Sequence, residues 1–279
     1  MGSRTRVWIV LGAIAIAAAI YFMPKKAGDK KEGEKVQEAT GSLPAAGIEK
    51  FIEDGKKQYT ATQLTKVEEL EAELKKSASP SVTTLESLGQ TWDALKQPGI
   101  AAHYYEQKAR IDQGEKSYIN AAYRYFDAFK ASADSAEKNM WVEKAIGAYT
   151  KVLELNPANL NAKTDLGICY AEGTGDPMKG IMLLREVVTE DPKHENAHLN
   201  LGFLSVKSAQ YEKAMERFDK VLAINPNRID IYIYKGETAL QMGDQAKAMD
   251  YFSKFMAQSQ DDAMKMQVEA YMNELKKEQ

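Results

Sequence analysis

KHENAHLNLGFLSVKSAQYEKAMERFDKVLAINP, residues 193–226, is the stretch that decides the fold. In its second half Ala214, Phe218 and Val221 recur at helical spacing, so one face of a helix is expected to be buried. The stretch ends in an Asn-Pro step, and a proline cannot continue the hydrogen bonds of a helix. Similar Asn-Pro or Asp-Pro steps, 35 and 34 residues apart, end three successive amphipathic runs at Pro157, Pro192 and Pro226. The sequence therefore contains repeated copies of one helical unit.

Three adjacent copies have small residues and one large apolar residue at matching positions. They are Leu201, Gly202, Ala214 and Phe218 in the copy quoted, Leu166, Gly167, Gly180 and Leu184 in the copy before it, and Lys235, Gly236, Ala248 and Phe252 in the copy after it. This pattern resembles the tetratricopeptide repeat, whose period is about 34 residues. The resemblance implies an all-α fold, a right-handed superhelix or α-solenoid of stacked helix-turn-helix units.

Each of the shared residues has a physical role in such a unit. Gly202 and Ala214 are small because two antiparallel helices must approach closely where they cross. Phe218 fills the space that remains between the helices. A single helix pair could not bury its apolar face, which is why such units stack.

Composition allows a sizeable core and disfavours one class of partner. Of the 279 residues 44% are apolar, and the formal net charge is −3 with both signs interspersed. A nucleic-acid groove would need a basic face, so we expect no nucleic-acid partner. The single cysteine, Cys169, excludes a disulfide within the chain.

An apolar segment near the start predicts a membrane anchor. Residues 7–23, VWIVLGAIAIAAAIYFM, carry no charge, and a helix of this length is near the lower limit for crossing a bilayer. The alternative is a cleaved signal peptide, which the residues after the segment disfavour because Pro24 is followed by two lysines. We expect a single-pass protein of bacterial type in the inner (cytoplasmic) membrane.

The orientation of the anchor stays open. Positive charges flank it on both sides, and the larger number after it favours a cytoplasmic repeat domain. A short positive tail before one apolar segment is typical of a signal anchor that exports the rest of the chain. We favour a periplasmic repeat domain.

The predicted organisation has six parts. They are the tail 1–6, the transmembrane anchor 7–23, a polar linker 24–45, a charged helical region 46–80, about five repeats over 81–260 and a capping helix 261–279. The repeats are 82–113 (degenerate), 115–157 (with an insertion), 158–192, 193–226 and 227–260. The insertion, ASADSAEKNMW at 131–141, predicts an enlarged turn that is either a partner-binding edge or a tolerated surface loop.

One short motif suggests chemistry. His194, Glu195 and His198 match H-E-x-x-H, in which two histidines one helical turn apart bind zinc and the glutamate is the base. A zinc hydrolase is therefore an alternative function. The repeat pattern already accounts for these residues, and we predict no catalytic residue, no metal and no cofactor.

The family resemblance also implies a binding surface. The first helices of such repeats line a concave groove, and the implied groove residues here are Asn161, Asp165, Ile168, Asn196, Asn200, Phe203, Lys207, Asp230, Tyr234, Glu237 and Gln241. Some family members hold a terminal carboxylate with cations at such positions, but Asp165 and Glu237 replace those cations here. Phe203 and Tyr234 instead form an apolar centre suited to a peptide with apolar anchors and some basic character. Alternatively, they pack against a neighbouring repeat.

The resulting functional hypothesis is a membrane-tethered scaffold or adaptor that binds a peptide or helix of another protein. By resemblance, such proteins assist secretion, envelope assembly or chaperone networks. A structural protein that assembles by stacking its repeats between molecules is a further alternative.

Overall fold

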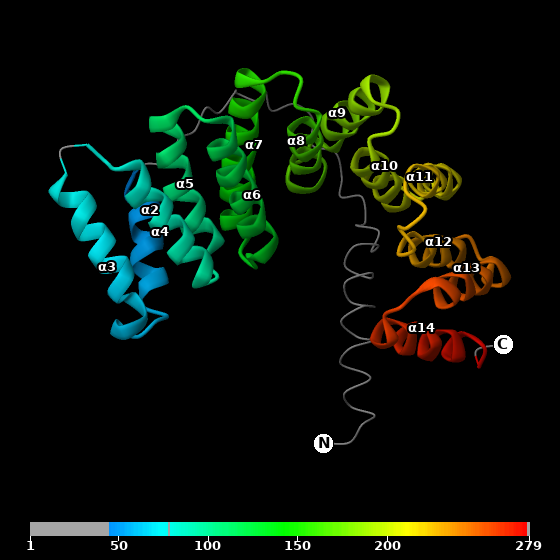
Figure 1. Cartoon of the computed structure of the whole chain (residues 1–279). Coiled ribbons are helices and arrows are strands. Elements are labelled where there is room, and N and C mark those ends of the chain that lie inside the picture. Colours follow the sequence, from blue (N-terminus) through cyan, green and yellow to red (C-terminus); the bar gives the residue numbers. More distant parts are fainter. Residues whose placement is uncertain (1–44, 78, 278–279) are drawn as a thin grey trace, which may run out of the picture. The chain divides into compact units, whose positions relative to one another are not determined.

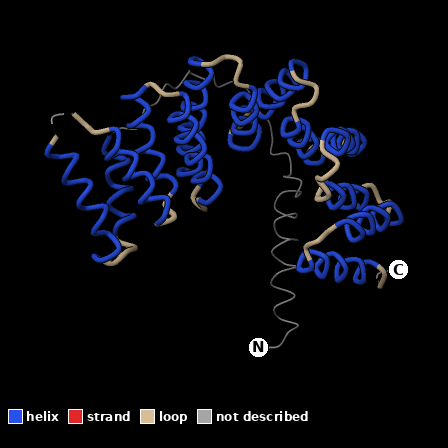
Figure 2. Tube along the Cα trace, viewed as in Figure 1, coloured by secondary structure: helices blue, strands red, loops and turns tan. Residues whose placement is uncertain are grey.

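The computed structural model describes residues 45–77 and 79–277 (Figure 1). This part of the chain forms thirteen helices joined by turns, without a strand (Figure 2). The helices are α2 (Ala45–Lys56), α3 (Ala61–Lys76), α4 (Val82–Ala94), α5 (Pro98–Asp112), α6 (Glu115–Ala131), α7 (Ser135–Leu155), α8 (Leu160–Gly173), α9 (Pro177–Glu190), α10 (Glu195–Lys207), α11 (Tyr211–Ile224), α12 (Ile231–Gln241), α13 (Gln245–Gln258) and α14 (Asp262–Leu275). The predicted all-α helical repeat is thus confirmed over the described residues.

The described chain divides within α9 into two compact units. We call residues 45–183 the N-terminal unit and residues 184–277 the C-terminal unit. In the first unit each helix from α3 to α8 packs on the next one along the chain (Figure 1). The same holds from α10 to α14 in the second unit. Most of the packing is therefore between sequence neighbours, as expected of a repeat protein.

Glycines at the helix crossings let an aromatic ring from the paired helix lie against the backbone. A Cβ placed on Gly202 would lie 2.7 Å from the ring of Phe218, and one on Gly236 would lie closer still to the ring of Phe252. Both rings are almost completely buried. The small and aromatic residues that define the repeat therefore meet in one contact.

In two repeats, the asparagine before the closing proline ties the repeat to its own first residue. The Asn156 amide donates to Glu115, the first residue of α6, over 3.1 Å, and Asn159, beyond the proline, donates to the same carboxylate over 2.6 Å. Asn225 likewise donates to Glu195, the first residue of α10, over 3.0 Å. The Asn-Pro step therefore supplies a hydrogen bond as well as a helix end.

The prediction of an enlarged turn at 131–141 is wrong. Helix α6 continues to Ala131 and α7 begins at Ser135, so the extra residues lengthen the two helices to 17 and 21 residues. The Asp134 side chain caps α7 by accepting a hydrogen bond from the Glu137 backbone N–H over 2.9 Å. Trp141 is 1% exposed, with its ring centroid 5.8 Å from that of Tyr125. Part of the supposed loop is therefore core.

The regions before and after the repeats are helical. The segment 46–80 contains two helices, of which α3 packs on α4 and α2 packs on α5. Phe51 of α2 lies edge-on to Trp141, with a centroid distance of 4.9 Å. At the other end α14 packs on α13, and the ring of Tyr271 lies 5.7 Å from that of Phe252.

The predicted membrane anchor, residues 7–23, lies outside the described residues, as do the tail and nearly all of the linker 24–45. Within 45–77 and 79–277, no helix combines the length and the apolar character needed to span a bilayer.

Gly236→Ala should lower the free energy of unfolding by about 2 kcal/mol, because the new methyl group must displace the buried ring of Phe252. Urea unfolding followed by circular dichroism measures the change. Gly147→Ala in α7 is the matched control, since no heavy atom outside its own helix backbone lies within 4 Å of its added Cβ. The control should be unchanged or more stable by up to about 1 kcal/mol. Equal effects at the two positions would contradict the close-crossing argument.

Candidate functional site

The aromatic residues predicted for the groove form a cluster in the C-terminal unit. Phe203 of α10 and Tyr234 of α12 lie edge-on, with a centroid distance of 4.8 Å and an interplanar angle of 90°. The ring of Phe218 of α11 lies close to both, with centroid distances of 5.7 Å to Phe203 and 6.1 Å to Tyr234. Phe203 and Tyr234 are half-buried, so each packs against a neighbouring repeat and still offers part of its ring to solvent.

Two carboxylates near Tyr234 differ in environment, Asp230 directly before α12 and Glu237 within it. Asp230 accepts two hydrogen bonds from the Arg228 guanidinium, over 2.9 and 2.8 Å. Glu237, three residues beyond Tyr234, has no hydrogen bond or ion pair with any described residue. Burial raises the pKa of Glu237 to about 7. Glu237 is therefore the carboxyl group here that would gain most from a cation brought by a partner.

The remaining predicted groove residues fall into two groups. In the C-terminal unit Asn196, Lys207 and Gln241 are exposed, whereas Asn200 is half-buried and donates to the Asn196 carbonyl over 2.8 Å. Asn200 is thus directed at its own helix. The N-terminal unit contains the other three, of which Asn161 is exposed and Asp165 and Ile168 are half-buried.

The histidines of the HENAH motif make structural hydrogen bonds. His194 precedes α10 and accepts a hydrogen bond from the Ala197 N–H at its Nδ1 over 3.2 Å. His198 is buried, with Nε2 3.0 Å from the Pro192 carbonyl oxygen and Nδ1 3.1 Å from an Arg217 nitrogen. Burial lowers the pKa of His198, with Arg217 acting in the same direction. A zinc ion at His198 would have to replace the guanidinium.

The glutamate of the motif is also engaged. Glu195 accepts from Asn225 and forms an ion pair with Arg228. Among the residues the structure describes, no group of three or more His, Cys, Asp or Glu side chains could hold a metal ion. The motif therefore stabilises a repeat, and the geometry gives the zinc hydrolase alternative no support.

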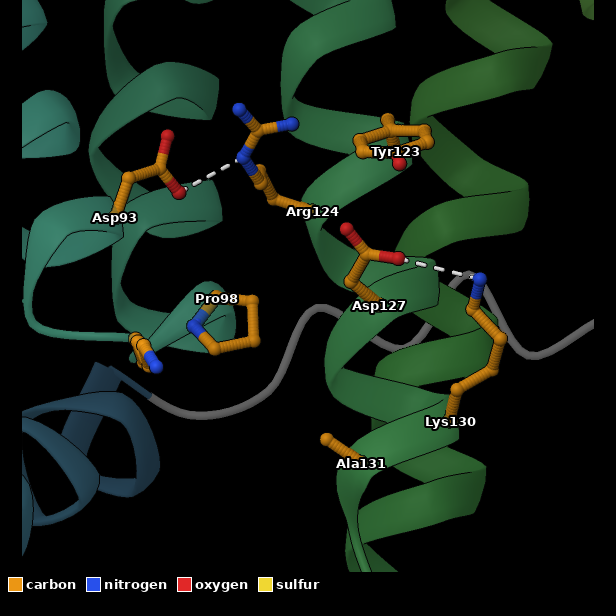
Figure 3. Close-up of a pocket in the computed structure, with 8 residues that line it drawn as sticks. Asp93, Pro98, Tyr123, Arg124, Asp127, Lys130 and Ala131 are labelled. Carbon is orange, nitrogen blue, oxygen red and sulfur yellow. Dashed lines mark hydrogen bonds and ion pairs between the residues drawn. The ribbon is translucent and has the colours of Figure 1, made fainter. Parts of the chain in front are cut away.

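A cavity that the sequence reading missed lies in the N-terminal unit, between the α4–α5 turn and α6 (Figure 3). It has a volume of about 680 Å³ and is lined by Asp93, Lys96, Pro98, Tyr123, Arg124, Asp127, Lys130 and Ala131. Tyr123 follows Ala121 and Ala122 in its repeat, as Phe203 follows Leu201 and Gly202 in another. This shared position in the repeat could have predicted that Tyr123 lines a surface site.

Arg124 is held in this cavity by a chain of hydrogen bonds. Its Nε donates to Asp93 over 2.7 Å (Figure 3). The other oxygen of Asp93 accepts from the Tyr105 hydroxyl over 3.0 Å. The hydrogen bond to Asp93 raises the pKa of Arg124. The guanidinium carbon lies 5.1 Å from the ring centroid of Tyr123, whose side chain is 49% exposed. The arginine and tyrosine side chains thus lie next to each other at the cavity.

Comparison with known sequences agrees with this repeat geometry. Residues 171–232 match the family model described as "Tetratricopeptide repeat". The match supports membership of the tetratricopeptide repeat family. A TPR repeat-containing protein of Methanocaldococcus jannaschii is 29% identical over 146 residues, which are 46% of this chain and 26% of that protein. The mitochondrial import receptor subunit TOM70 of Rattus norvegicus is 22% identical over 138 residues, which are 50% of this chain and 23% of that protein.

A solved structure shows the same fold over most of the chain. A tetratricopeptide repeat protein from Parabacteroides merdae aligns with a TM-score of 0.56 and 19% identity, covering 82% of this chain and 86% of that one. The chain spans only about a quarter of the length of the two curated relatives. The sequence similarity therefore covers only a part of each relative.

Glu237→Gln should stabilise the protein above neutral pH. The folded-state pKa of about 7 lies above the ordinary value, so the folded protein holds a proton that the unfolded chain releases. The stability tied to this proton is fully present below about pH 4.5 and is lost as the pH rises through about 7. The amide variant does not titrate, so its advantage should grow over this range to about 2 kcal/mol at pH 8.

Urea unfolding at about pH 5 and about pH 8 measures this difference. Glu269→Gln, at an exposed position of α14, is the control for loss of one charge. A constant difference between Glu237→Gln and the unmodified protein across this range would show that Glu237 is solvated.

Proposed function

We propose that this chain is a membrane-tethered scaffold whose tetratricopeptide repeats bind a peptide or helical segment of another protein. Proteins of this family generally mediate protein–protein interaction, and one relative is named as an import receptor subunit. The observation that carries the proposal is the half-buried Phe203–Tyr234 pair beside Glu237. Within the C-terminal unit, this pair is an apolar anchor point next to an unpaired carboxyl group.

The chemistry of this surface defines the bound segment. Two rings at right angles leave an edge and a face against which an apolar side chain can pack. A lysine or arginine of the partner would pair with Glu237 and lower its pKa, so the carboxyl group would lose its proton on binding. The expected ligand therefore combines an apolar anchor with a nearby basic residue, and binds more tightly at pH 8 than at pH 6.

A membrane tether would confine this binding surface to the vicinity of the bilayer. With residues 7–23 in the inner membrane, the polar linker would hold the repeats close to the bilayer. A bound partner then gains effective concentration toward other membrane components. Secretion, envelope assembly and chaperone networks are the settings in which this recruitment is useful, and a periplasmic repeat domain is the orientation we favour.

Phe203→Ala combined with Tyr234→Ala should abolish recovery of the partner after crosslinking in cells, because both halves of the apolar anchor point are removed. Mass spectrometry of the crosslinked products measures recovery, and circular dichroism checks that helicity is retained. Tyr251→Ala is the matched control, since it truncates a half-buried aromatic on α13 of the same unit. Undiminished recovery by a folded double variant would place the binding surface elsewhere.

Topology is tested by a single cysteine in the linker. Cys169→Ala removes the buried native thiol, and Ala39→Cys introduces one between the apolar segment and the repeats. A thiol reagent that cannot cross the inner membrane should label this variant in intact cells. Labelling only after lysis would put the repeats in the cytoplasm, and recovery of the chain in the soluble fraction would remove the anchor from the proposal.

A further inference from the structure

The cavity in the N-terminal unit carries more positive than negative charge available to a ligand. Three cations line it, and of its two carboxylates each is already paired within the protein. Asp93 accepts from Arg124 and Tyr105, and Asp127 lies 3.2 Å from Lys130. Lys96 has no ion pair with a described residue. A bound anion would therefore not have to compete with a free carboxylate.

Arg124 is preorganised to bind a carboxylate. Its Nε is fixed on Asp93, and no described residue accepts a hydrogen bond from its two terminal nitrogens. Figure 3 shows the dashed line to Asp93 leaving from Nε, with no such line from either terminal nitrogen to the residues drawn. A guanidinium presents such nitrogens as a planar fork that matches the two oxygens of a carboxylate. Because the side chain is already ordered, binding costs little further conformational entropy.

Lys96 is placed at the cavity by a turn that does not require a lysine. It has a positive φ of 56°, and the turns within two other repeats have Ala209 at 57° and Gly243 at 76°. The same backbone hydrogen bond closes the turns after Lys96 and Gly243, from Gln97 N to Trp92 O and from Asp244 N to Ala239 O. A side chain at such a φ costs about 1 kcal/mol relative to glycine. The lysine is therefore tolerated in the turn at a cost.

The remaining wall is apolar. Tyr123 is 49% exposed, and Pro98 and Ala131 line the cavity on the sides of the α4–α5 turn and of α6 (Figure 3). A volume of about 680 Å³ is within the range of pockets that enclose small ligands or several side chains. The cavity thus combines a cationic side with an aromatic surface.

We propose that this cavity binds an acidic segment of a partner protein, with a glutamate or aspartate carboxylate between Arg124 and Lys96 and an adjacent apolar side chain on Tyr123. A polyphosphate or nucleic acid fits less well, because Asp93 and Asp127 also line the cavity and offset two of its three cations, so the net positive charge is too small for a polyanion. The site is distinct from the Phe203–Tyr234 pair, which lies in the other unit and favours a basic ligand.

The test uses fluorescence anisotropy of the full chain with a labelled ten-residue peptide of alternating glutamate and phenylalanine. Arg124→Gln should weaken binding about tenfold, because it removes the charged fork. Lys96→Gly should weaken it about threefold while leaving the turn unstrained, so loss of folding is not an explanation. Arg124→Lys, which retains the charge without the fork, should weaken binding by an intermediate factor.

Three controls make the result specific. Lys151→Gln removes one exposed, ion-paired charge from α7 of the same unit, and Ala209→Gly relaxes the corresponding turn of another repeat. Neither should change binding. A peptide of alternating glutamine and phenylalanine should bind at least about tenfold more weakly than the acidic peptide.

Several outcomes would overturn the proposal. If the amide peptide binds as tightly as the acidic peptide, binding depends on apolar contact alone. If Lys151→Gln weakens binding as much as Arg124→Gln, binding depends on the overall charge of the protein. Displacement of the peptide by inorganic phosphate at similar concentration would indicate a free-anion site. Loss of binding in Phe203→Ala with Tyr234→Ala, but not in Arg124→Gln, would assign the peptide to the other unit and leave the proposed scaffold function intact.

Discussion

The contact between a glycine on one helix and an aromatic ring on its partner determines the geometry of the repeats. At Gly202 and Gly236 the ring of the paired helix occupies the space where a Cβ would lie, and Gly89 has the same relation to Tyr105. Burial of one such ring contributes about 2 to 3 kcal/mol, and the close approach also fixes where the two helices cross. The first helix of each pair, with its exposed side chains, is therefore held at a defined position. Both candidate sites depend on this, since their residues project from first helices or from the turns that come after them.

The sequence predicts this contact well because it involves few residues at fixed spacing. A glycine and a phenylalanine 16 residues apart, as at Gly202 and Phe218, define a crossing without knowledge of the rest of the chain. The same approach failed at 131–141, where extra length was interpreted as a loop. That segment contains neither glycine nor proline, and Asp134 followed three residues later by Glu137 is a helix-start signal. The number of extra residues alone does not show whether they lengthen the turn or the helices on either side of it.

The candidate sites were predictable to different degrees. The nearness of Phe203 and Tyr234 follows from their places in neighbouring first helices, so the sequence was sufficient. The burial of Glu237 depends on the elements that cover it, and no local pattern encodes that cover. The cavity beside Tyr123 was missed because its repeat, 115–157, has Ala121 and Ala122 where three other repeats have leucine and glycine, which weakened the match to those repeats. A weak repeat signature thus concealed a well-defined surface.

The hydrogen bonds across the closing proline bear on how these repeats could be recombined. Glu115 is held by one asparagine before the proline and by another after it, and Glu195 is held by Asn225 before its proline and by Arg228 after it. A boundary drawn at the proline would separate two partners of one carboxylate. A transferable unit therefore begins at the glutamate and extends two residues past the proline. A chimera joined at the proline would lose the partner of that carboxylate that follows the proline. A chimera joined two residues later would retain both partners.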